Sequence, residues 1–157
     1  MGYSVPGNLD LKHILSMLYQ GLDVKAGEPL DLSSPLVHFG VYVDDEDNPV
    51  ALAASDLSFA VYSSCAMTMV PAPVAEEAIK SGVLEDMMKD NLGEVMNILS
   101  RLFMLGSTTH LRFTEVLSVA ELPEAAAQIL TNTAKQTWLE VEVPRYGTGV
   151  IGFLISS

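Results

Sequence analysis

The chain has 157 residues, of which 49% are hydrophobic, and this length is enough to bury one substantial core. Its formal net charge is −12, with 20 Asp and Glu residues against eight Lys and Arg, and a surface of that sign repels nucleic-acid phosphates and anionic lipid. We therefore expect one domain over residues 1–157 and no nucleic-acid partner. Acidity also serves solubility, so it does not identify a basic partner.

Cysteine content and the N-terminal residues point to a reducing compartment. The only cysteine, Cys65, excludes an intramolecular disulfide and a cysteine cluster for zinc. It lies in the apolar stretch 59–67, where a small buried thiol is expected rather than a nucleophile. Residues 1–6 contain no basic leader, and no apolar run reaches the length of a membrane span. These features predict a cytoplasmic protein without a membrane span.

In chain order, the first predicted elements are a helix and a hairpin. Asp10 can cap a helix from Leu11 to Tyr19, and Gly21 can end it. The apolar segments 36–43 and 50–54 are separated by a short polar, acidic stretch, which predicts two strands joined by a turn.

Three helices are predicted next. Ser55 or Asp56 can cap a helix of small and apolar residues that reaches about Met69, before a proline-rich break. A further helix starts near Val74 and is interrupted at Ser81-Gly82. The longest helix then extends from Leu84 to Met104, with Gly106 as its end.

The remainder of the chain is predicted to be mostly strand. Residues 111–117 form a strand and 123–130 a short helix, and 137–143 pairs with 149–156 in a last hairpin. Helices that separate runs of hairpin-connected strands favour an α+β fold over a doubly wound parallel sheet. We expect a mostly antiparallel sheet packed with long helices.

The long helix carries a polar stripe formed by Asp90, Glu94 and Asn97. Offsets of 0, 4 and 7 residues place the three side chains within roughly 60° of one another around a helix. Apolar residues recur at helical spacing on the opposite face, namely Leu84, Met88, Leu92, Val95, Leu99 and Leu102. The core is thus satisfied without the polar stripe, which presents a carboxylate and a carboxamide side by side to solvent.

This motif resembles the signature of the CheC and CheX family of chemotaxis phosphatases. In that family Asp or Ser is followed after three residues by Glu, and after two more by Asn. The chain is similar to CheX in particular, because it contains one copy of the motif, and the order of predicted elements matches from about residue 9 to 157. The resemblance implies a CheC/CheX-like fold and removal of phosphate from the phospho-aspartate of CheY-type receivers.

The resemblance also implies roles for the three residues. A carboxamide can orient an attacking water in phosphoryl transfer, so Asn97 is the candidate for that role. Glu94 would hold the receiver's active-site lysine through a charge-assisted hydrogen bond, and Asp90 would support the other two. The family resemblance implies no cofactor of the chain's own, Mg²⁺ supplied by the receiver, and a homodimer.

Two alternatives remain open on the sequence. Exposed polar residues at this spacing are ordinary on amphipathic helices, and Arg101 extends the stripe, where it can pair with Glu94 or Asn97. The chain could also be a noncatalytic binding or dimerisation module that uses an exposed strand such as 150–155. Residues 98–101 are bulkier than those usual after the family's Asn, and the following strand lacks the family's frequent Pro.

Other patterns do not indicate a second chemistry. His13, His38 and His110 are far apart and lack metal-ligand spacing, so we predict no bound metal. A nucleophile elbow, a phosphate-binding glycine loop and a dinucleotide fingerprint are all missing from the sequence. The eight methionines are expected to fill the core; they include Met67, Met69, Met87, Met88, Met96 and Met104.

Overall fold

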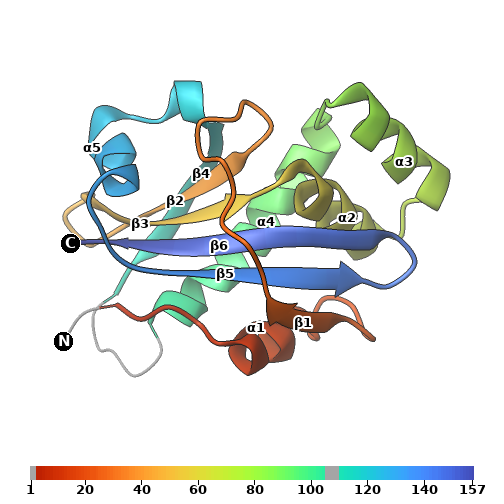
Figure 1. The fold of residues 1–157 in the computed structure, drawn as a ribbon, viewed down its shortest axis with the longest axis horizontal. Helices are drawn as coiled ribbons and strands as arrows, with labels where there is room; N and C mark the ends of the chain where they lie inside the picture. The colour runs from red at the N-terminus through yellow and green to blue at the C-terminus, as the bar shows by residue number, and fades with distance from the viewer. Residues whose placement is uncertain (1–2, 105–109) are drawn as a thin grey trace.

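The computed structural model describes residues 3–104 and 110–157. Its elements follow in chain order (Figure 1): α1 (Asn8–Leu15), β1 (Asp23–Ala26), β2 (His38–Val43), β3 (Pro49–Ser55), α2 (Leu57–Thr68), α3 (Ala72–Ser81), α4 (Asp86–Phe103), β4 (Arg112–Ser118), η1 (Val119–Glu121), α5 (Glu124–Ala127), η2 (Gln128–Leu130), β5 (Thr133–Val143) and β6 (Gly147–Ser156).

The described strands form one six-stranded sheet in the order β1-β5-β6-β3-β2-β4. Every neighbouring pair is antiparallel, and Figure 1 shows the strands running side by side with helices around them. The fold is therefore α+β with an antiparallel sheet, as the element order predicts.

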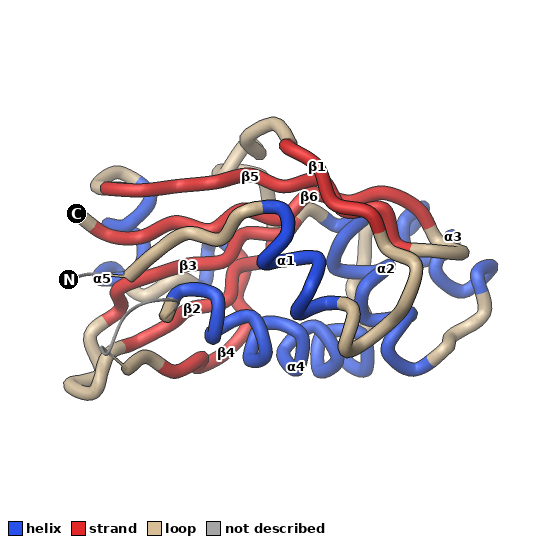
Figure 2. Tube along the Cα trace, turned by 90° about the horizontal axis from the view of Figure 1, so that it is seen from below, coloured by secondary structure: helices blue, strands red, loops and turns tan. Residues whose placement is uncertain are grey.

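Both faces of the sheet are covered, which explains why its central strands are apolar throughout rather than alternating. One face packs against α1, α2 and α4 through a large core that includes Leu15, Phe59 and Leu92. The other face packs against the short helices α5 and η2, through Ala126 and Ile129. Figure 2 shows α1 and α4 running beside the sheet, with α5 at one end.

The first helix begins earlier and ends earlier than predicted. It spans Asn8–Leu15 with Gly7 as the N-cap residue, and looser turns follow it up to Tyr19. Asp10 lies inside the first turn, where its carboxylate accepts a hydrogen bond from the Gly7 N–H at 2.9 Å. Asp10 therefore stabilises the helix start as a third-position acceptor and not as the N-cap.

The second helix is capped as predicted. Asp56 accepts a hydrogen bond from the Phe59 N–H at 2.8 Å, and most side chains of α2 are buried. A helix that is apolar on all sides is one that lies inside the protein. Cys65 is one of its buried residues and is a free thiol, as predicted.

The last strand, β6, is not an exposed strand. It pairs with β5 along one edge and with β3 along the other, and Ile151, Phe153 and Leu154 are buried. The alternative in which segment 150–155 is an exposed strand that binds a partner is therefore wrong. Its apolar composition reflects a central position in the sheet, because β1 and β4 form the edges.

The methionines are only partly core residues. Met88 and Met96 are buried, as predicted, whereas Met69 and Met87 are 76% and 48% exposed. The predicted role of Gly106 in ending the long helix falls on residues outside the described part of the chain. Within the described ranges, none of the helices has the length and apolar character needed to cross a membrane.

Candidate functional site

The candidate site is built on α4, the longest described helix, whose two faces differ sharply. Five of the six predicted apolar positions are buried, namely Met88, Leu92, Val95, Leu99 and Leu102. The sixth, Leu84, precedes the helix and is partly buried. Asp90, Glu94 and Asn97 lie on the opposite face and are exposed. The helix thus presents the stripe to solvent, as its periodicity predicts.

Two buried contacts fix how α4 is rotated about its axis. The hydroxyl of Tyr42, on β2, donates a hydrogen bond of 2.6 Å to the carbonyl oxygen of Met96. The backbone of β2 also approaches closely, since a Cβ added at Gly40 would lie 3.1 Å from the Met96 sulfur. Because Met96 directly precedes Asn97, these contacts set the direction in which the Asn97 side chain leaves the helix.

A third contact joins α4 to α2 one residue after Asp90. The Nδ2 of Asn91 donates to the carbonyl oxygen of Ser64 at 3.2 Å and to Oγ1 of Thr68 at 3.3 Å. Asn91 therefore turns inward while Asp90 turns outward, which separates a structural amide from the exposed stripe.

The side chains of the stripe are available for a partner. Asp90, Glu94 and Asn97 form no side-chain hydrogen bond or ion pair with another residue of the described chain. Arg101 is exposed, but it pairs with neither Glu94 nor Asn97, so the alternative in which the stripe is neutralised by Arg101 is not observed. Of the bulky residues after Asn97, Leu99 and Ser100 are buried and add nothing to the exposed face.

The stripe forms one wall of a shallow groove between α4 and β4. The groove has a volume of about 760 Å³ and is lined by Asp86, Lys89, Asp90, Gly93, Glu94, Asn97, Phe113, Glu115 and Val116. Four carboxylates and one ammonium group line it, so its formal charge is −3. A groove of that charge favours a cationic group on whatever enters it.

Gly93 also lines this groove and lies between Asp90 and Asn97 in the sequence. A Cβ added there would meet, outside the helix's own backbone, only the edge of the Phe113 ring, at 3.9 Å. That distance is an ordinary contact, so packing within the chain does not require a glycine. Its effect is that the groove is lined by helix backbone, without a side chain, at this position.

The sequence identified part of this site and missed the rest. Asp86 lies four residues before Asp90, and Gly93 lies three residues after it. Lys89 lies four residues before Gly93. Helical spacing could therefore have placed all three on the same face as Asp90. Phe113, Glu115 and Val116 come from β4. Their position depends on the pairing of β4 with β2, which no local sequence pattern reports.

None of the three histidines is among the residues that line this groove. His13 lies in α1, His38 begins β2, and His110 precedes β4 and lies 3.0 Å from a carboxylate oxygen of Asp45. Burial lowers the pKa of His38. No group of three or more His, Cys, Asp or Glu residues within the described ranges is arranged to hold a metal ion.

Sequence comparison finds no matching protein-family model and no matching curated protein. The fold, in contrast, matches several solved structures. FliM in the FliM–SpeE complex from H. pylori aligns with a TM-score of 0.66 and 10% identity, over 95% of this chain and 81% of that chain. Thermotoga maritima FliY aligns with a TM-score of 0.57 and 15% identity, over 94% and 82%.

CheX is also among the matching structures. The CheX–CheY–BeF3–Mg²⁺ complex from Borrelia burgdorferi aligns with a TM-score of 0.53 and 14% identity, over 95% of both chains. The chain therefore has the CheX/CheC-like fold that its motif and element order indicate. At these identities the likeness extends to the fold and not to the roles of individual residues.

Proposed function

We propose that this protein removes phosphate from the phospho-aspartate of a CheY-type receiver. The observation that carries the proposal is the exposed stripe of Asp90, Glu94 and Asn97, which has no partner within the described chain and lines a groove. The stripe lies on a fold shared with CheX, a protein solved in complex with CheY.

The reaction needs little covalent help from the phosphatase. An aspartyl phosphate is an acyl phosphate, and attack of water on phosphorus releases inorganic phosphate and restores the carboxylate. Catalysis then rests on placing one water in line with the leaving oxygen. The carboxamide of Asn97 can accept a hydrogen bond from that water and donate one to a phosphoryl oxygen, so Asn97 is the proposed water-positioning residue.

Glu94 and Asp90 are proposed to orient the receiver. The Glu94 carboxylate lies one helical turn before Asn97 and can bind the lysine of the receiver's active site by a charge-assisted hydrogen bond. Asp90 lies one turn further back and adds negative charge at the same groove. Mg²⁺ is proposed to be supplied by the receiver, and this chain to act as a homodimer that leaves the stripe uncovered.

The lifetime of the phosphoryl group on a CheY-type receiver from the same genome tests this proposal. The wild-type protein is expected to shorten the lifetime, and Asn97→Ala to lower the rate about a hundredfold or more, as loss of one aligned polar group does in other enzymes. The fold should be unaffected, because an exposed substitution changes stability by only about 0.5 kcal/mol. Asn8→Ala, at another exposed helical amide, is the matched control and should keep the wild-type rate.

The second candidate function is noncatalytic binding, which the match to FliM supports because FliM is solved in complexes with SpeE and with FliG. Such a module would bind its partner without shortening any phosphoryl lifetime, and binding would survive the double change Glu94→Ala and Asn97→Ala. The edges β1 and β4 are the strands available for pairing in that case. An unchanged lifetime across all receivers of the genome would favour this function over the phosphatase.

A further inference from the structure

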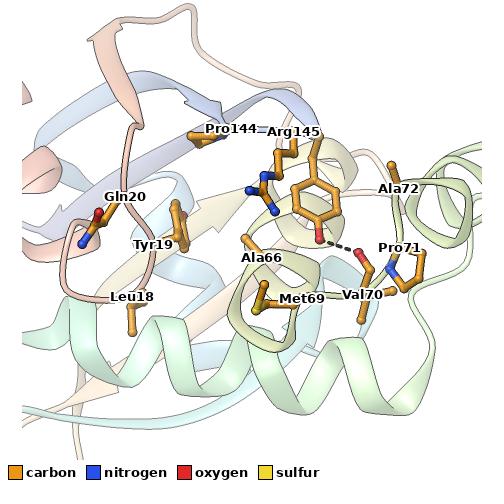
Figure 3. A pocket seen from close by; sticks show the side chains of 11 residues that line it. Leu18, Tyr19, Gln20, Ala66, Met69, Val70, Pro71, Ala72, Pro144 and Arg145 are labelled. Atoms are coloured by element: carbon orange, nitrogen blue, oxygen red, sulfur yellow. Dashed lines mark hydrogen bonds between the residues drawn. The ribbon is translucent and has the colours of Figure 1, made fainter.

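A second cavity lies away from the α4 groove, where three connections of the chain meet (Figure 3). It has a volume of about 620 Å³ and is lined by Leu18, Tyr19, Gln20, Ala66, Met69, Val70, Pro71, Ala72, Pro144, Arg145 and Tyr146. These residues come from the segment after α1, the end of α2 with its link to α3, and the turn between β5 and β6. Its volume and mostly apolar walls are typical of sites for small ligands.

Arg145 is the only charged residue among those that line this cavity. In a chain with a formal charge of −12, a cationic cavity without a carboxylate in its lining is unexpected. Arg145 forms no ion pair with any residue of the described ranges. Figure 3 shows its guanidinium group on the side of the cavity that faces Tyr19, near Ala66.

The backbone at Arg145 adopts a conformation that is unfavourable for a residue with a side chain. The Tyr146 N–H donates to the carbonyl oxygen of Val143 at 3.1 Å, which closes a turn with Pro144 and Arg145 at its centre. Arg145 has a φ of 75°, a value that turns of this kind normally assign to glycine. An arginine in that place costs stability, and such strain is concentrated at functional sites.

A second strained residue lines the same cavity. Met69 has a φ of 55° and its side chain is 76% exposed. The described chain has only three non-glycine residues with positive φ, and two of them are Met69 and Arg145. Met69 and Arg145 thus line the same cavity, and neither of them lines the α4 groove.

The aromatic wall of the cavity is held in place before any ligand arrives. The Tyr146 hydroxyl hydrogen-bonds to the carbonyl oxygen of Val70 (Figure 3) and lies 3.3 Å from that of Cys65. The Tyr146 ring therefore cannot turn away without losing these bonds. A preformed site loses less conformational entropy on binding.

We propose that this cavity binds a small organic anion, in which a carboxylate is held by the Arg145 guanidinium and an apolar body lies against Tyr19, Val70 and Tyr146. The planar guanidinium matches a carboxylate with two parallel hydrogen bonds, which a lysine cannot reproduce. The Gln20 amide, on the opposite side of the cavity (Figure 3), is the second polar group available to the ligand. This proposal does not depend on the phosphatase function.

The test is NMR titration of the intact protein with phenylacetate, indole-3-acetate and hexanoate, each compared with its neutral primary amide. The expected result is saturable shifts of the Met69 methyl group and the Arg145 side-chain N–H with the carboxylates, at a dissociation constant of about 1 mM or tighter. Arg145→Gln should weaken binding about ten- to hundredfold, since a charge-assisted hydrogen bond is lost. Lys80→Gln, which removes an exposed charge outside the cavity, should bind as the wild type does.

Arg145→Gly separates the ligand role from a structural one. Glycine suits the positive φ of this position, so the variant is expected to melt at or above the wild-type temperature and yet lose carboxylate binding. A lower melting temperature in Arg145→Gly would show that the arginine is retained for stability and would overturn the proposal. Equal affinity for carboxylates and amides, or no shift at the cavity residues with any probe, would overturn it as well.

Discussion

Gly93 shows at the residue scale how the groove differs from ordinary helix surface. Glycine in a helix interior costs about 0.5–1 kcal/mol relative to alanine, and the described structure has room for a Cβ at this position. The cost is explained if a partner must reach the helix backbone between Asp90 and Asn97. Stability and function then make opposite demands on this residue.

Gly93→Ala is therefore expected to stabilise the folded protein and to lower its phosphatase activity. The free energy of unfolding should rise by about 0.5–1 kcal/mol, which raises the melting temperature by about 1–4 °C for a chain of this size. The rate of receiver dephosphorylation should fall, because the added methyl group covers helix backbone that lines the groove. Thermal unfolding and the phosphoryl-lifetime assay measure the two effects, and an unchanged rate would show that the partner does not approach here.

The α2 helix shows how one side chain at an element boundary can join two elements. The Asp56 carboxylate accepts hydrogen bonds from the Phe59 N–H at 2.8 Å and from the Val150 N–H on β6 at 3.1 Å. Desolvation by burial nevertheless raises the pKa of Asp56 above its ordinary value of 3.8, against the effect of both hydrogen bonds. The Asp56 carboxylate is thus well placed to accept both hydrogen bonds, but its burial makes the ionised form costly.

Two variants of Asp56 separate these contributions. Asp56→Ala loses both hydrogen bonds and is expected to lower the free energy of unfolding by about 1–2 kcal/mol. Asp56→Asn keeps an oxygen acceptor and cannot ionise. Because the folded-state pKa of Asp56 is raised, the folded wild type binds a proton that the unfolded chain does not, so this residue's contribution to stability grows as pH falls through its folded pKa and is lost as pH rises.

As pH is lowered through the raised folded-state pKa toward the ordinary value of 3.8, the melting temperature of the wild type should therefore rise relative to that of Asp56→Asn. The wild type and Asp56→Asn share all other titrating groups, so the pH dependence due to those groups cancels in the comparison. A difference that moves in the other direction would mean that the hydrogen bonds outweigh desolvation and that the pKa of Asp56 is lowered.

Elements with a strong periodic pattern are predictable from this sequence, and elements fixed by pairing are not. The α4 helix and its stripe follow from helical spacing alone, and the hairpin of β2 and β3 follows from two apolar runs around a polar turn. The β1 strand was not predicted, because Val24 is its only buried residue and a single apolar position carries no period. The strand exists because it pairs with the far end of β5.

The groove illustrates the same limit at the candidate site. Helical spacing predicts the wall formed by α4, whereas the wall formed by β4 depends on the order of strands in the sheet. The strand order also determines whether β6 is buried in the sheet or exposed. An apolar strand has the same sequence pattern in the centre of a sheet and at an interface, so the pattern does not distinguish the two. Strand order follows from long-range packing, which local patterns do not encode.

For the molecule as a whole, the strand order makes β6 one of the two central strands of the sheet, together with β3. It is paired on both edges and contacts α2 on one face and η2 on the other. Strands of that kind exchange their amide hydrogens only on global unfolding, whereas edge strands open locally. We expect the amides of β6 and of its neighbour β3 to be the best protected, and those of β1, which has one buried side chain, to exchange fastest among the strands.

Hydrogen exchange followed by NMR or mass spectrometry measures this order directly, and it also bears on self-association. If the protein forms a dimer, the protection of β6 should not depend on protein concentration, because its hydrogen-bonding edges are already occupied. Added protection on dimerisation should appear at β1 or β4, whose outer edges are free of pairing within the described chain. Rapid, concentration-dependent exchange in β6 would contradict this topology and would return that strand to the surface as an interface.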